Sequence, residues 1–305
     1  MDDFYARTVR LLLRVAPGVF ANDIFAMKGG TAINLFVRDM PRLSVDIDVA
    51  YVQWQTPREE ALREISDEIN AIASRLGKIG LAARKIRHKD LGDTKLIVEH
   101  DNVQVKVEVN VVFRGTVLST ERRSVHGSTA AMFSIALEVP TLAVDELYGS
   151  KLVAALDRQH PRDLFDVWQM MQSGGISDAM IECFVTYLAG HNRPIHEVLF
   201  SKDRDFAREY NESYIGMTRE PVELSILVEA RALLRKELLR RLTGRHKQFL
   251  IGLSRAQPDW SLLLCPYSAE LPALRWKLAN LETFRKRRAA DFEQQAKELE
   301  DNLSR

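Results

Sequence analysis

The spacing of hydrophobic and polar residues changes several times along the first part of the chain, and each change marks a different predicted element. Apolar residues at helical spacing predict an amphipathic helix over residues 4–15, ended by Pro17-Gly18. Residues 25–28 form a short apolar segment that is closed by Gly29-Gly30, and helix-compatible residues follow from Thr31 to Val37. We therefore expect a strand, a tight turn and a helix in succession.

Residues 45–52 alternate between acidic and apolar side chains, which is the period of a half-buried strand. Asp46 and Asp48 share one face of this strand, and Ile47 and Val49 share the other. Both carboxylates are therefore expected to project to the same side of a sheet.

Further along, a helix is predicted over residues 58–76 and a hairpin from residues 95–99 and 103–113, turned at residues 100–102. Beyond Pro140 the pattern becomes helical, with expected helices at 142–156, 162–171, 178–188, 222–242 and 271–284 and a charged last segment at 285–305. We expect an α+β fold in which a mixed β-sheet core is flanked by helices and followed by a mainly α-helical C-terminal domain. The expected domains are residues 1–172 and 173–305, with Gly174-Gly175 as a hinge.

Composition narrows the class of protein. The chain has 305 residues, 46% of them hydrophobic, which excludes intrinsic disorder and favours two domains. Charged residues interrupt every apolar run, so we expect no membrane segment, and an acidic start argues against export. The 2 cysteines are far apart and support neither a disulfide framework nor a zinc site, so a cytoplasmic protein is expected.

The candidate chemistry lies in the glycine turn and the acidic strand. Glycines after a strand let backbone amides approach a phosphate, and the following helix N-terminus favours negative charge. Asp46 and Asp48 offer adjacent oxygen ligands that suit Mg²⁺ held also by substrate phosphates, and Glu108 is a third carboxylate on the next predicted strand. Alternatively, the glycines form a plain turn and the aspartates a solvated polar face.

Three sequence runs together resemble a known family. They are Lys28-Gly29-Gly30-Thr31-Ala32-Ile33-Asn34-Leu35, then Arg42-x-Ser44-x-Asp46-Ile47-Asp48, then Asp145-Glu146-Leu147 with Lys151, Arg158, Arg162-Asp163 and Asp166. The chain resembles the nucleotidyltransferase superfamily with the DNA polymerase β-like fold, and more closely the AbiEii toxin family, which is related to the MenT toxins. The resemblance covers about residues 25 to 170 and implies a nucleoside triphosphate (NTP) as substrate, with Mg²⁺, two ions of it, as cofactor.

The resemblance turns the candidate residues into three sets. The expected catalytic residues are Asp46, Asp48, Glu108, Lys151 and Asp163, with Asp166 as the alternative to Asp163. The expected NTP-binding residues are Lys28, Gly29, Gly30, Thr31, Arg42, Ser44, Lys106 and Lys151. The expected metal ligands are Asp46, Asp48 and Glu108.

For the second half of the site, alternatives stay open at the sequence level. Lys151 is also compatible with a surface ion pair to Asp145 or Glu146 on its own helix, worth about 0.3 to 0.5 kcal/mol. Asp163 is compatible with a plain position in the first turn of a helix, where it favours the helix dipole. Ser44 lies beside the two aspartates, so phosphorylation there would oppose triphosphate binding, which makes it a candidate regulatory site.

The charge distribution suggests an acceptor. The chain has 43 Lys and Arg against 42 Asp and Glu, but residues 219–288 hold a local excess of basic residues that is typical of RNA binding. The resulting hypothesis is transfer of a nucleoside monophosphate to an RNA hydroxyl, with the family pointing to the tRNA 3′ end and to a separately encoded antitoxin. The alternatives are a non-catalytic nucleotide-binding module, a protein or small-molecule acceptor, and an acidic protein as partner of the basic region.

Overall fold

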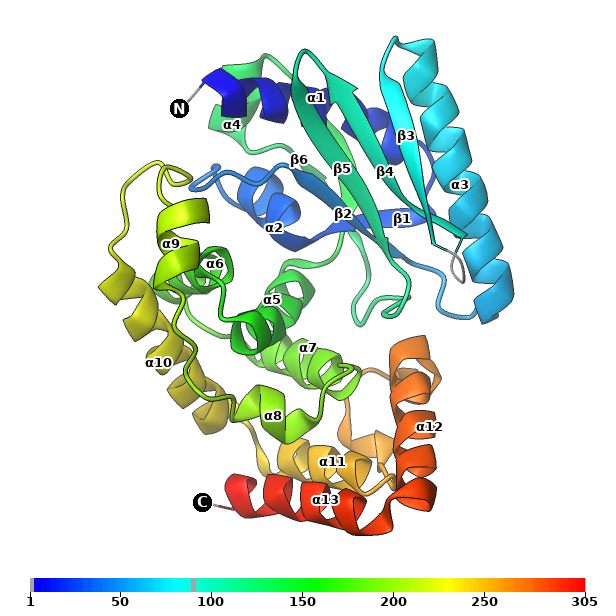
Figure 1. Ribbon diagram of the computed structural model, residues 1–305, viewed down its shortest axis with the longest axis vertical. Helices are drawn as coiled ribbons and strands as arrows, with labels where there is room; N and C mark the ends of the chain where they lie inside the picture. Colours follow the sequence, from blue (N-terminus) through cyan, green and yellow to red (C-terminus); the bar gives the residue numbers. More distant parts are fainter. Residues whose placement is uncertain (1–2, 89–91, 305) are drawn as a thin grey trace. The chain divides into compact units, whose positions relative to one another are not determined.

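The computed structural model describes residues 3–88 and 92–304, and it contains two compact units (Figure 1). The first comprises Met1–Leu147 with Gly216–Glu220, and the second comprises Tyr148–Ile215 with Pro221–Arg305. The domain boundary expected at residues 172 and 173 therefore falls within the second unit.

The first unit is built on a seven-stranded sheet with the order β3-β4-β5-β2-β1-β7-β6. Its strands are β1 (Phe25–Lys28), β2 (Asp46–Tyr51), β3 (Ala82–His88), β4 (Gly92–His100), β5 (Val103–Asn110), β6 (Glu121–Ser124) and β7 (Glu138–Thr141). β2 is antiparallel to β1 and parallel to β5, so the sheet is mixed, as predicted. The alternating pattern of β5 buries Val105 and Val107 and leaves Glu108 exposed.

Two long helices, α1 (Asp3–Val19) and α3 (Arg58–Lys78), contact each other and cover one face of the sheet. The apolar sides of β2 and β5 are buried beneath them, which leaves the opposite face for the polar residues of both strands. The remaining helices of this unit are short: α2 (Gly29–Thr31), the π-helix η1 (Ala32–Val37) and α4 (Gly127–Phe133).

The predicted end of the first helix at Pro17-Gly18 is wrong, because α1 continues to Val19 with Pro17 inside it. Gly18 lies against α3: its carbonyl accepts a hydrogen bond from Arg75 Nε at 2.9 Å, and a Cβ at position 18 would meet Leu76 Cδ2 at 3.0 Å. Packing on α3 thus supports a last turn that the Pro-Gly pair alone would not predict.

The hairpin of β4 and β5 was predicted, but its second strand ends at Asn110 rather than at Phe113. The Asn110 side-chain Oδ1 accepts hydrogen bonds from the amides of Val112, at 3.1 Å, and Phe113, at 2.9 Å. This local turn takes the chain out of the sheet three residues early. Strands β3, β6 and β7 were not predicted.

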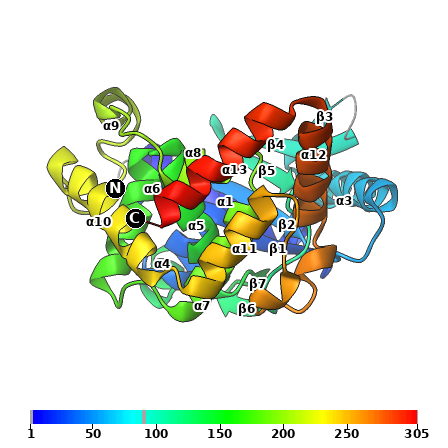
Figure 2. The same ribbon diagram turned by 90° about the horizontal axis from the view of Figure 1, so that it is seen from below.

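The second unit is helical, as expected for the C-terminal part of the chain (Figures 1 and 2). Its helices are α5 (Val144–Arg158, which begins in the first unit), α6 (Pro161–Gln172), α7 (Asp178–Ala189), α8 (Ile195–Leu199), α9 (Ala207–Ser213), α10 (Leu224–Arg241), α11 (Gly244–Ser254), the short η2 (Trp260–Leu262) and η3 (Ser268–Glu270), α12 (Pro272–Arg287) and α13 (Ala289–Leu303). Figure 2 shows α13 running beside α11 and meeting the end of α12, where the Phe284 and Phe292 rings pack edge to face at 6.0 Å. None of the described helices has the length and apolar character needed to span a membrane.

Candidate functional site

The turn after β1 lies beneath side chains that the sequence singled out. Gly29 has a left-handed φ of 75°, and a Cβ there would lie 2.6 Å from Asp48 Oδ2. A Cβ on Gly30 would lie 2.8 Å from both Arg42 Nη2 and Ser44 Oγ. A side chain at either position would have to displace Asp48, Arg42 or Ser44, and at Gly29 it would also have to adopt a left-handed φ.

Hydrogen bonds tie this turn to the start of β2. Thr31 Oγ1 lies 3.0 Å from Ser44 Oγ and also donates to the Asp46 carbonyl. Asn34 Nδ2 donates to the Gly30 carbonyl at 2.9 Å, a contact that was not predicted. Arg42 is only 3% exposed. We call Gly29, Gly30, Thr31, Arg42 and Ser44 the glycine cradle.

Strand register brings the acidic candidates together beside this cradle. Asp48 is the Cα partner of Lys28 on β1 and of Glu108 on β5, and Asp46 is the partner of Lys106. Asp46, Asp48, Lys106 and Glu108 consequently share the face of the sheet opposite α1 and α3.

Glu108 has a partner that the sequence did not indicate. Its Oε2 lies 2.8 Å from Lys95 Nζ on β4, whose register places Lys95 beside Glu108. Among the described residues, no group of three or more His, Cys, Asp or Glu side chains is arranged to hold a metal ion. Asp46 and Asp48 share this face, so Mg²⁺ here would be held by these two carboxylates together with substrate phosphates, and Glu108 would join them only after leaving Lys95.

The second unit holds the other predicted residues in a buried ion cluster. Lys151 Nζ on α5 lies 2.8 Å from Asp163 Oδ1 and 3.0 Å from Asp166 Oδ2, both on α6. Arg158 Nη2 lies 2.9 Å from Asp163 Oδ2. The Lys151 and Asp163 side chains are each 6% exposed and that of Asp166 is 1% exposed. The Arg158 side chain, by contrast, is 60% exposed. We call these four residues the Lys151 cluster.

This geometry bears on alternatives that the sequence left open. Lys151 is not a surface residue, because its side chain is buried beside Asp163 and Asp166, and the Glu146 carboxylate accepts hydrogen bonds from the amides of Val117 and Leu118. Asp163 does occupy the first turn of α6, but its carboxylate contacts Lys151 and Arg158. Lys151 contacts both Asp163 and Asp166, so its contacts do not choose between the two aspartates.

Comparison with known proteins supplies the family. The family model described as "Nucleotidyl transferase AbiEii toxin, Type IV TA system" matches residues 10–280. The chain belongs to the AbiEii nucleotidyltransferase toxin family. It is thus a nucleotidyltransferase toxin of a type IV toxin–antitoxin system, and membership implies a cognate antitoxin.

The fold has a counterpart among solved structures. MenT4, a nucleotidyltransferase toxin from Mycobacterium tuberculosis H37Rv, matches with a TM-score of 0.59 and 20% sequence identity over 90% of each chain. At this identity the match shows that the AbiEii-family chain has the nucleotidyltransferase fold expected from its sequence. No curated protein sequence matches the chain.

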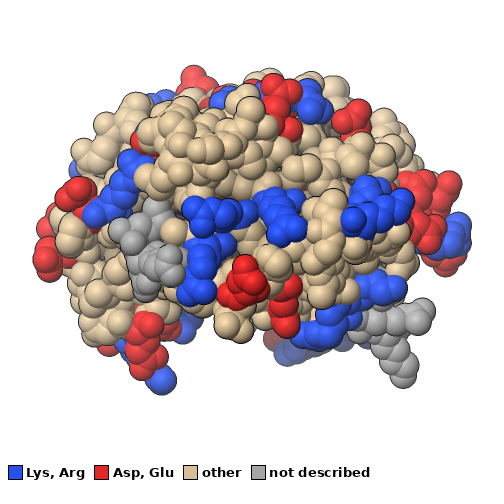
Figure 3. Space-filling model, turned by 90° about the horizontal axis from the view of Figure 1, so that it is seen from above, with Lys and Arg blue, Asp and Glu red and all other residues tan. Residues whose placement is uncertain are grey.

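The basic region of this family member is largely engaged in its own structure. Ten of its fifteen Lys and Arg residues form hydrogen bonds or ion pairs with other described residues, as Arg245 and Arg255 do with Glu182 and Glu300. The other five are Lys236, Arg275, Arg285, Lys286 and Arg287. Figure 3 shows Lys and Arg side chains across the middle of the face drawn there, with Asp and Glu side chains among and around them.

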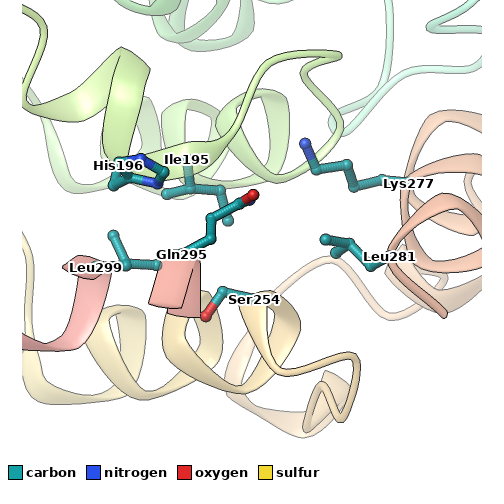
Figure 4. Close-up of a pocket in the computed structure, with 7 residues that line it drawn as sticks. All are labelled: Ile195, His196, Ser254, Lys277, Leu281, Gln295 and Leu299. Atoms are coloured by element: carbon teal, nitrogen blue, oxygen red, sulfur yellow. The ribbon is translucent and has the colours of Figure 1, made fainter. Parts of the chain in front are cut away.

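A small hollow between helices of the second unit is a separate feature (Figure 4). Lys277 lines it together with His196, Ser254 and Gln295. Burial lowers the pKa of Lys277 to about 8, and its Nζ donates to the carbonyls of His191, at 2.9 Å, and Arg193, at 2.7 Å. The lysine thus serves to hold the chain before α8, and none of the predicted site residues lines this hollow.

Proposed function

We propose that the protein transfers a nucleoside monophosphate from an NTP to the 3′ end of an RNA, with tRNA as the acceptor, and so blocks translation. The observation that carries this proposal is the glycine cradle, in which two missing Cβ atoms make room for Asp48, Arg42 and Ser44. A backbone turn that admits a carboxylate and a guanidinium this closely is suited to a triphosphate with its counter-ion.

In this proposal the cradle binds the triphosphate. Arg42 and Lys28 offset phosphate charge, while the backbone of Gly29 and Gly30 lies close to the phosphate oxygens. Lys106, the Cα partner of Asp46, supplies further positive charge on the same face. Positioning and charge stabilisation are the main contributions a protein makes to phosphoryl transfer.

Asp46 and Asp48 would hold Mg²⁺, one ion or two, which offsets phosphate charge and lowers the pKa of the attacking hydroxyl when bound. Glu108 would join them after giving up its ion pair with Lys95. We further propose that the Lys151 cluster serves the same reaction, with the charge of Lys151 directed to the triphosphate, and that the functional nucleotidyltransferase domain extends to residue 172.

An exposed face of α12 supports RNA as the acceptor. Trp276, Asn280, Thr283 and Arg287 recur at helical spacing and are exposed, and Trp276 is 46% exposed. An exposed indole ring offers a base-stacking surface, and the basic residues at the end of α12 offer phosphate contacts. The reaction would take place in the cytoplasm, where NTPs and tRNA are available.

Ser44 remains our candidate for regulation. Its hydroxyl lies 3.0 Å from Thr31 Oγ1 and against Gly30. A phosphate on Ser44 would occupy the cradle and place about −2 charge where the triphosphate binds. Protein silenced in the presence of its antitoxin, but unmodified at Ser44 by intact-mass analysis, would contradict this mode of regulation.

The decisive experiment offers purified protein each of the four labelled NTPs with Mg²⁺ and tRNA, either intact or with its 3′ ribose oxidised by periodate. We expect label on intact tRNA only, and a loss of at least about 100-fold in Asp48→Asn. Asp67→Asn on α3, an exposed aspartate of the same unit, is the matched control and should retain activity.

Three outcomes would redirect the proposal. Full activity in Asp48→Asn would remove the acidic face from the mechanism. Label on another RNA, a protein or a small molecule, with none on tRNA, would keep the chemistry and change the acceptor. NTP binding without any transfer would favour a non-catalytic module.

A further inference from the structure

A short segment that is distant in sequence packs against the glycine cradle. Gly216–Glu220 belongs to the first unit, although the residues before and after it belong to the second. We call Gly216–Glu220 the strap. It pairs with the loop of residues 38–44, which carries two residues of the cradle, Arg42 and Ser44.

The pairing between strap and loop resembles a short antiparallel ladder. The Leu43 amide donates to the Met217 carbonyl at 2.8 Å, and the Arg219 amide donates to the Pro41 carbonyl at 3.0 Å. Arg42 and Thr218 are the bridge partners between these bonds. The strap therefore fixes the backbone on both sides of Arg42.

A side-chain cluster anchors the same contact. Arg219 Nη1 lies 3.1 Å from Asp39 Oδ2, and Asp39 Oδ1 accepts hydrogen bonds from Ser128 and Thr129. His126 Nδ1 also lies 3.1 Å from Asp39 Oδ1. The hydrogen bond from Ser128, followed by the charge of Arg219, lowers the pKa of Asp39 to about 2.

The loop needs such support because its backbone is strained. Met40, between the anchored Asp39 and Pro41, has a left-handed φ of 46°, which a residue with a side chain rarely adopts. Residues in such conformations persist when the surrounding structure holds them there. The Met40 amide donates to the Asn34 carbonyl at 2.7 Å, and the strap forms its two backbone hydrogen bonds with Pro41 and Leu43, shortly after Met40 in the chain.

We propose that the strap is a positioning element for nucleotide binding: by pairing with residues 39–43, it holds Arg42 and Ser44 over Gly30 in the geometry that receives the triphosphate. The inference rests on the proposed function, because it assumes that the cradle binds NTP. Arg219 acts here as a positioning residue through Asp39 and Pro41, without contact to the nucleotide.

The test measures NTP affinity separately from turnover in the full-length protein. Arg219→Gln removes the ion pair but keeps the backbone amide, and Arg219→Lys restores the charge. Arg208→Gln on α9 is the matched control, since it removes another exposed ion pair, to Glu212 at 2.9 Å. Each variant is titrated calorimetrically with all four NTPs and Mg²⁺ and assayed for kcat, KM and melting temperature.

We expect Arg219→Gln to raise the Kd and KM for NTP roughly 3- to 10-fold, with kcat within about 2-fold and the melting temperature nearly unchanged. Arg219→Lys should recover most of the affinity and Arg208→Gln should match the wild type. Asp39→Asn combined with Arg219→Gln should be no weaker than the weaker single variant, because both remove one contact.

Wild-type NTP affinity in Arg219→Gln would overturn the inference, as would a loss of affinity that follows a fall in melting temperature. A wild-type protein that binds no NTP would instead reject the proposed function, and the strap's role with it. The first result leaves the proposed function standing, so the two failures are distinguishable.

Discussion

The acidic face of β2 and the Lys151 cluster both carry residues expected to act in catalysis, but they differ in how their charges are balanced. On the strand face, Asp46 is half-buried and Glu108 is exposed, and the positions beside them hold lysines. In the cluster, two aspartates and Lys151 are nearly excluded from solvent and contact one another directly. A ligand can approach the first set without breaking the fold, whereas the second set is part of the fold.

Because of this difference, a loss of activity has a different meaning in the two sets of residues. Removing an exposed carboxylate costs little stability, so a loss of activity reports on chemistry. Removing one member of a buried ion cluster leaves an uncompensated charge. A loss of activity in such a variant can therefore come from impaired folding alone. Stability has to be measured beside activity in the second unit.

The largest expected effect breaks the buried cluster. Lys151→Ala leaves Asp166 buried without its ion-pair partner Lys151, and we expect the free energy of unfolding to fall by about 3 to 5 kcal/mol. Asp46→Asn on the strand face should change it by less than about 0.5 kcal/mol. Urea unfolding of the three proteins measures both values.

A compensated variant sharpens the same comparison. Lys151→Met combined with Asp166→Leu replaces two buried charges with apolar side chains and should recover much of the lost stability while remaining inactive. A Lys151→Ala protein as stable as the wild type would show that the buried Asp163 and Asp166 do not need the charge of Lys151.

The next effect compares two glycines with the same φ angle. Gly29 and Gly80 both have a φ of 75°, but a Cβ at position 80 meets no atom within 4 Å. We expect Gly80→Ala to cost about 1 kcal/mol through its backbone alone, and Gly29→Ala to cost about 1 to 3 kcal/mol more through its contact with Asp48.

Gly29→Ala should also lose at least about tenfold in NTP incorporation, while Gly80→Ala keeps its activity in correctly folded protein. Denaturant curves and single-turnover assays on both variants provide the measurements. Equal costs at the two positions would mean that Asp48 moves away from residue 29 freely, and that the cradle is not rigid.

The sequence was most informative where one strand or helix contains the whole signal. The alternation of β2 and β5 predicted which residues share a face, and helical spacing predicted α3 and α10. Strands β3 and β6 are rich in charged residues and lack such alternation, so their place in the sheet comes from pairing with β4 and β7.

Contacts between distant segments explain what could not be predicted. Asp163 and Asp166 are separated by one helical turn and so face the same side of α6, which is why the spacing alone could not choose between them. The partner of Glu108 depends on the register between β4 and β5, and the strap meets Asp39 across 180 positions. Neither contact has a local signal in the sequence.

A smaller effect tests which of the two units provides the basic residues that bind RNA. Lys286→Gln with Arg287→Gln neutralises exposed residues at the end of α12, and we expect RNA affinity to fall a few-fold and the salt dependence of binding to weaken by up to about two ions. Arg63→Gln with Lys78→Gln on α3 removes the same charge from the first unit and should change binding less.

Filter binding of labelled tRNA between 50 and 200 mM salt, roughly the range over which phosphate contacts dominate, separates the two pairs. A larger loss from the α3 pair would move the RNA surface to the first unit.

The smallest effect concerns Asp39, whose side chain is more exposed than the aspartates of the Lys151 cluster and less exposed than Glu108 on the strand face. Asp39 has a side chain that is 32% exposed, and its pKa is lowered from 3.8 to about 2, first by the hydrogen bond from Ser128. A carboxyl with a lowered folded-state pKa contributes stability above its unfolded pKa and loses it as pH falls through the folded value. The contribution should therefore be complete above about pH 4 and vanish toward pH 2. Solvent screening keeps this contribution to the free energy of unfolding below about 1 kcal/mol.

Wild-type and Asp39→Asn proteins, unfolded in urea from pH 5 to pH 2, should differ in stability at pH 5 and converge at the acid end. A constant difference over that range would mean that Asp39 acts through its shape rather than its charge.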